Sequence, residues 1–131
     1  MIVVADDDPL VQHSCKYCLE AAGYEVTLAT TGWEALHALE KSQVLAVLVD
    51  VFMPDMDGIE TLLSIKRQNP ATSVIVMTGG GARGGMDFLA TASRLGADAV
   101  VQKPFTAEQL VAAVGRCGGP VWEMGERRAK A

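Results

Sequence analysis

Five short strand-like runs, most of them continuously apolar, alternate with five longer helix-like stretches along the chain. Continuous apolar runs of strand length are typical of strands that are buried on both faces of a sheet. The predicted strands cover residues 2–5, 25–29, 44–50, 73–78 and 99–102. The predicted helices cover residues 9–22, a stretch that opens at 31 or 32, and residues 59–68, 86–95 and 107–117. Strict alternation predicts a parallel sheet with helices on both faces, a three-layer α/β/α sandwich.

Residues that start and stop helices support these boundaries. Asp8 precedes Pro9, and this pair suits a helix start, with aspartate as the N-cap and proline at the first helical position. Gly23 and Gly96 follow the first and fourth helices and suit their C-terminal ends. We expect one domain over residues 1–118 and a tail over residues 119–131.

Polar residues occur directly after the predicted strands. Asp6 and Asp7 follow the first strand, Asp50 ends the third, Thr78 ends the fourth and Lys103 follows the fifth. In open parallel sheets, ligands bind beyond the carboxyl ends of the strands, at the point where the strand order reverses. We therefore expect these five side chains to converge on one edge of the sheet.

Three neighbouring carboxylates predict a bound cation. Two unit charges 4 Å apart repel by about 4 kcal/mol at an effective dielectric constant of 20. A few oxygen ligands from the protein suit Mg²⁺, which keeps several water molecules and often binds phosphate oxygens. Lys103 would add a positive charge and Thr78 a hydroxyl group. An aspartate beside Mg²⁺, a lysine and a hydroxyl is a combination suited to phosphoryl transfer.

These features together resemble the receiver domains of two-component response regulators, and the resemblance covers residues 2 to about 117. Its motifs occur in family order at residues 3–9 (VVADDDP), 49–54 (VDVFMP), 56–58 (MDG), 76–79 (VMTG), 96–98 (GAD) and 103–105 (KPF). The resemblance implies a flavodoxin-like (CheY-like) fold with a five-stranded parallel sheet of order 2-1-3-4-5. It also implies phosphorylation of Asp50 by a histidine kinase or phosphotransfer protein.

The resemblance further implies how the metal is held. Asp7 and Asp50 would bind Mg²⁺ directly, together with the backbone carbonyl of Phe52, and Asp6 would act mainly through metal-bound water. Asp8 matches no site position of the family and is interpreted as the helix cap.

For the phosphoryl group, the resemblance implies contacts with Lys103 and Thr78. Receivers usually carry an aromatic switch residue three positions before the lysine, and here that position is Val100. We therefore expect phosphorylation to act mainly on residues 79–85 and the fourth helix. The target protein would bind the face formed by the fourth helix, the fifth strand and the fifth helix.

Two other functions are considered beside the phosphoacceptor. An adapter could keep the receiver fold and signal without phosphorylation, although all five site residues are present. A phosphohydrolase of the haloacid dehalogenase type would need a second aspartate two residues after its nucleophile, where this chain has Phe52. We expect no enzyme activity apart from hydrolysis of the chain's own phosphoryl group.

The net charge and the cysteine content limit which binding partners and which cellular compartment are expected. The net charge is −5, and residues 1–115 carry 14 acidic and 7 basic residues, so DNA binding by this domain is not expected. No apolar run is long enough for a membrane span, and acids follow Ala5 directly, which does not fit a signal peptide. The three cysteines are an odd number, and reduced thiols in the cytoplasm are expected.

Overall fold

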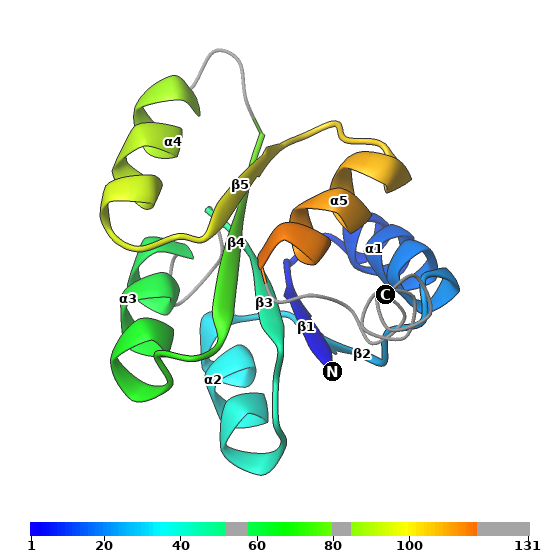
Figure 1. The fold of residues 1–131 in the computed structure, drawn as a ribbon, viewed down its shortest axis with the longest axis horizontal. Helices are drawn as coiled ribbons and strands as arrows, with labels where there is room; N and C mark the ends of the chain where they lie inside the picture. The colour runs from blue at the N-terminus through cyan, green and yellow to red at the C-terminus, as the bar shows by residue number, and fades with distance from the viewer. Residues whose placement is uncertain (52–57, 80–84, 118–131) are drawn as a thin grey trace, which may run out of the picture.

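The computed structural model describes residues 1–51, 58–79 and 85–117. A five-stranded parallel sheet of order β2-β1-β3-β4-β5 forms its centre (Figure 1). The strands are β1 (Ile2–Ala5), β2 (Val26–Ala29), β3 (Ala46–Asp50), β4 (Ser73–Thr78) and β5 (Ala99–Gln102). The helices are α1 (Pro9–Ala21), α2 (Gly32–Lys41), α3 (Gly58–Gln68), α4 (Gly85–Arg94) and α5 (Ala107–Cys117). The predicted three-layer sandwich and its strand order are confirmed.

The sheet separates two hydrophobic cores. Helices α1 and α5 cover one face of the sheet, and α2, α3 and α4 cover the other (Figure 1). Side chains alternate along β1, so that Ile2 and Val4 join the core beneath α1 and α5. Val3 and Ala5 join the core on the opposite face. Asp6, Asp50 and Thr78, which end or follow strands of the sheet, belong to neither core.

The predicted helix signals act as expected. The Asp8 side chain accepts a hydrogen bond from the Leu10 N–H at 2.9 Å and caps α1. Gly23 follows α1 with a φ of 100°, and Gly96 follows α4 with a φ of 112°. Both are left-handed conformations that favour glycine, which is why these helices end there.

Several element ends differ from the prediction by one or two residues. Strand β3 begins at Ala46 and not at residue 44. The Val44 carbonyl accepts a hydrogen bond from the Thr72 hydroxyl at 3.0 Å, so this residue bonds to a side chain before the strand ladder begins. Helix α3 begins at Gly58, one residue earlier than predicted, and α4 covers 85–94 and not 86–95. Hydropathy does not mark such ends, because hydrogen bonding determines them.

No helix in the described part of the chain is long and apolar enough to cross a membrane. Three sequence predictions fall outside the described residues: the Phe52 carbonyl, residues 80–84 of the glycine-rich segment, and the tail at 119–131.

Candidate functional site

Three carboxylates meet where β1 and β3 end. Asp6, Asp7 and Asp50 each offer an oxygen, and these oxygens all lie within 4.8 Å of one another. Asp6 is fully buried, Asp50 is 8% exposed and Asp7 is exposed. Strands β1 and β3 are adjacent and parallel in the sheet, which brings their carboxyl ends together. The predicted acidic cluster is therefore present, with one member open to solvent.

The carboxylate oxygens of Asp6 are both engaged by the protein. One oxygen, Oδ1, accepts a hydrogen bond from the Asp8 N–H at 2.8 Å. The other, Oδ2, accepts one from Lys103 Nζ at 2.8 Å. By contrast, no hydrogen bond reaches the Asp7 carboxylate within the described ranges. Asp7 thus has both oxygens available for a ligand, whereas each oxygen of Asp6 already accepts one hydrogen bond.

Lys103 supplies the positive charge beside the acids. Its Nζ lies 3.5 Å from Asp50 Oδ2, in addition to its contact with Asp6. Burial alone would lower the pKa of Lys103, but the hydrogen bond with Asp6 and the charges of Asp50 and Asp6 outweigh it. The pKa of Lys103 therefore lies above its ordinary value, and the ammonium stays charged at neutral pH.

Thr78 ends β4, between the strands that supply Asp50 and Lys103. It is 1% exposed, and its carbonyl accepts a hydrogen bond from the backbone N–H of Lys103 at 2.6 Å. Asp50 pairs in register with Met77, the residue before Thr78. The five predicted residues thus lie at the carboxyl ends of β1, β3, β4 and β5 or directly after them. These four strands are neighbours in the sheet.

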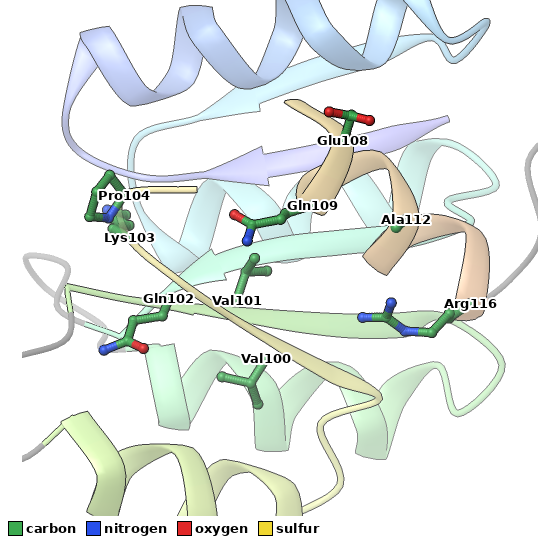
Figure 2. A pocket seen from close by; sticks show the side chains of 9 residues that line it. All are labelled: Val100, Val101, Gln102, Lys103, Pro104, Glu108, Gln109, Ala112 and Arg116. Atoms are coloured by element: carbon green, nitrogen blue, oxygen red, sulfur yellow. The ribbon is translucent and has the colours of Figure 1, made fainter. Parts of the chain in front are cut away.

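Val100 lies in β5, paired in register with Val76. Figure 2 shows Val100 and Val101 pointing to opposite sides of the strand, and they pack against different cores. Both line a groove of about 690 Å³ along β5 and α5, which also contains Glu108 and Arg116. The groove is thus lined by valines of β5 and by charges of both signs on α5.

Two residues to which the sequence assigned no role in the site contact it, Gln12 and Gly58. Gln12 on α1 is 8% exposed, and its side-chain amide donates to the backbone carbonyls of Asp6 and Ala29. Gly58 opens α3 so close to the end of β3 that a Cβ atom would lie 2.2 Å from the Asp50 carbonyl oxygen. A signal for Gln12 was available, because it precedes the buried Cys15 and Leu19 by three and seven residues and so shares their helix face.

Cys15 and Cys18 are free thiols within α1. Cys15 is fully buried, and Cys18 is partly exposed. Burial, together with the negative charge of Asp6, raises the pKa of the Cys15 thiol to about 12. This is the opposite of what a reactive cysteine requires.

We therefore expect iodoacetamide to leave Cys15 unmodified in the folded chain. At pH 8, a thiol with a pKa of about 12 is ionised to only about one part in ten thousand, and burial blocks the remainder. Peptide mass spectrometry after timed alkylation measures this, with Cys18 as the internal comparison and a denatured sample as the control. Equal modification rates of the two cysteines in the folded chain would contradict the expectation.

Comparison with known proteins identifies the protein family of this chain. The family model described as "Response regulator receiver domain" matches residues 2–115. The chain belongs to the response regulator receiver domain family. The haloacid dehalogenase alternative is thereby set aside, since the match covers nearly all of the described residues.

Relatives and solved structures agree with this assignment. The receiver domain is 35% identical to the transcriptional regulatory protein FixJ of Bradyrhizobium diazoefficiens over 113 residues, which are 86% of this chain and 54% of that protein. It is also 35% identical to the response regulator MprA of a Mycobacterium species, over 85% of this chain and 47% of that protein. The crystal structure of the receiver domain of NtrX from Brucella abortus matches with a TM-score of 0.83 and 28% identity, covering 89% of this chain and 97% of that one.

The receiver domain spans about half the length of these curated relatives. Receiver domains are signalling phosphoacceptors in two-component systems, and the family typically binds Mg²⁺. The acidic cluster, with its oxygen-only donor set and one open carboxylate, is chemically suited to such an ion.

Proposed function

We propose that Asp50 is the residue that accepts the phosphoryl group, from a histidine kinase or a phosphotransfer protein. The observation that carries this proposal is the position of Asp50 within the acidic cluster, with its Oδ2 3.5 Å from Lys103 Nζ. The Asp50 carboxylate and the Lys103 ammonium thus already lie side by side when no phosphodonor is bound. We place this activity in the cytoplasm, which agrees with the free thiols of Cys15 and Cys18.

In the proposed reaction, a carboxylate oxygen of Asp50 attacks phosphorus and forms the new O–P bond. The bond from phosphorus to the donor breaks, and the donor's leaving atom, an imidazole nitrogen in phosphohistidine, takes the electron pair. Lys103 would bind the phosphoryl oxygens through its ammonium group, and the Thr78 hydroxyl would donate a hydrogen bond to one of them. Such a transfer depends mainly on positioning and on charge neutralisation.

The same residues suit Mg²⁺. We propose that Asp7 and Asp50 bind the ion directly with the Phe52 carbonyl, and that Asp6 contacts it through water. The two engaged oxygens of Asp6 and the open carboxylate of Asp7 support this division of roles. When bound, Mg²⁺ neutralises the carboxylates and the incoming phosphoryl group.

Asp7→Ala is expected to weaken Mg²⁺ binding more than Asp6→Ala does. Loss of a direct ligand removes a metal bond, whereas loss of a residue that acts through water typically costs about tenfold or more in affinity. Isothermal titration calorimetry of both variants with Mg²⁺ measures the two dissociation constants. The reverse order would show that the roles of the two aspartates are exchanged.

For the output, we propose that phosphorylation changes the surface formed by α4, β5 and α5, to which a target protein binds. The groove along β5 and α5 lies on this surface and includes Lys103, which connects it to the site (Figure 2). Val100 has no ring that could move inward, so we assign the change to the segment before α4 and to α4 itself. No DNA contact by this acidic domain is proposed.

Incubation with a small-molecule phosphodonor and Mg²⁺ tests the proposed function. Intact-mass spectrometry should detect one phosphoryl group per chain, and a chelator should nearly abolish this product. The alternative, an adapter that signals without phosphorylation, predicts no adduct under any of these conditions. Hydrolysis of the adduct over time would in addition measure any autophosphatase activity.

A further inference from the structure

Gln12 forms a link between three elements directly beneath the acidic cluster. It lies in the first turn of α1 and is 8% exposed. Its Nε2 donates to the Asp6 carbonyl at 2.6 Å and to the Ala29 carbonyl at 3.0 Å. The Ala29 carbonyl also accepts the Asp6 N–H at 3.0 Å. One side-chain amide thus uses both of its hydrogens to join α1 to the ends of β1 and β2.

The carbonyl that Gln12 binds belongs to the peptide group between Asp6 and Asp7. A hydrogen bond to this oxygen fixes the plane of that peptide and therefore the direction in which Asp7 leaves the backbone. The Asp7 side chain is exposed and receives no hydrogen bond of its own among the described residues. The position of its carboxylate thus depends on the backbone that Gln12 holds.

An amide at this position is not what packing alone would favour. Gln12 shares its helix face with Cys15 and Leu19, which are both fully buried. Burying an amide is unfavourable unless its hydrogen bonds are made, and an apolar side chain would fill the space without that requirement. The two hydrogen bonds from the Gln12 amide to backbone carbonyls satisfy both of its N–H donors. One of them goes to the carbonyl of Asp6, next to Asp7.

We infer that Gln12 is a positioning residue for metal binding by this site. It holds the Asp6–Asp7 peptide so that the Asp7 carboxylate faces Asp50. The inference rests on the proposed function, because it assigns Asp7 as a direct ligand of Mg²⁺.

The test compares Gln12→Met with a matched control, Thr72→Val. Methionine has similar length and no donor. Thr72 is 2% exposed, and its hydroxyl donates to the Val44 carbonyl at 3.0 Å, so Thr72→Val also removes a buried bond from a side chain to the backbone. That bond lies next to the amino ends of β3 and β4, at the opposite edge of the sheet from the acids. Both variants should unfold at a lower temperature than the wild type.

Only Gln12→Met should change the metal site. We expect its dissociation constant for Mg²⁺ to rise about tenfold, as is typical when a partner outside the ligand set is lost, and that of Thr72→Val to stay at the wild-type value. At saturating Mg²⁺, labelling of Gln12→Met by the small phosphodonor should return close to the wild-type rate, because Asp50 and Lys103 are untouched. If Gln12→Met does not fold, Gln12→Asn replaces it, since its amide is one methylene too short to reach both carbonyls.

Two results would overturn the inference in distinguishable ways. Equal Mg²⁺ affinities of the Gln12 variant and Thr72→Val, with the wild type binding Mg²⁺ and accepting a phosphoryl group, would refute the role of Gln12 alone. A wild-type chain that binds no Mg²⁺ would refute both this role and the proposed function.

Discussion

Replacing Asp50 by asparagine is expected to abolish phosphorylation by a small-molecule phosphodonor. The amide has nearly the shape of the carboxylate but lacks the negatively charged oxygen that attacks phosphorus. Asp50 is 8% exposed at the end of β3, and asparagine has nearly the same volume, so the variant keeps its packing. Lys103 retains its 2.8 Å ion pair with Asp6 and stays in place. Intact-mass spectrometry should therefore detect no adduct on Asp50→Asn.

The matched control is Asp8→Asn. Asp8 belongs to the same acidic run, but its side chain caps α1, and asparagine is an equally good N-cap. This variant should accept the phosphoryl group at the wild-type level. Labelling of Asp50→Asn at the level of Asp8→Asn would show that another residue is the acceptor.

Gly58→Ala is expected to destabilise the fold and the site together. A Cβ atom at Gly58 would lie 2.2 Å from the Asp50 carbonyl oxygen and 2.7 Å from Val51 Cα. Both neighbours are backbone atoms at the end of a buried strand, and they cannot rotate away as a side chain would. The Gly58 N–H also donates to the Val51 carbonyl at 2.9 Å, which fixes the close approach. We expect the free energy of unfolding to fall by about 3 kcal/mol, the upper end for overpacking.

Urea denaturation measures this loss, and Gly79→Ala is the control. Gly79 follows β4 at the same edge of the sheet, but a Cβ atom there meets nothing within 4 Å. Its variant should unfold at the wild-type urea concentration or slightly above it. Mg²⁺ affinity should fall in Gly58→Ala as well, because the displaced backbone carries Asp50. Similar urea midpoints for Gly58→Ala and Gly79→Ala would show that the end of β3 can shift without lowering the free energy of unfolding.

The layers were predictable because apolar strand runs and helix stops alternate strictly in this chain, whereas the strand order came from the resemblance to receiver domains. Ile2–Ala5 and Ser73–Thr78 lie in the structure where the pattern predicts them. The start of β3 was predicted two residues too early, because Val44 is as apolar as the strand that follows but bonds to Thr72. Hydrophobicity locates a buried element, whereas its end depends on partners that are distant in sequence.

The convergence of the site residues followed from topology alone. Asp6 and Lys103 are 97 positions apart, and the sheet order brings them within 2.8 Å. Sequence could not show that Lys103 lies nearer to Asp6 than to Asp50, since this depends on side-chain conformation. The close approach of Gly58 depends on the path of the chain between β3 and α3 in the same way.

The two cores described above also have a consequence for how this sequence can diverge. Ala92 of α4 and Val100 of β5 pack on one side of the sheet, while Val101 and Leu110 pack on the other. Substitutions in the two cores that lie more than about 10 Å apart should combine additively. Under the proposed function, residues around α4 that bind a target can therefore change independently of α1, where Gln12 is proposed to support the acidic cluster.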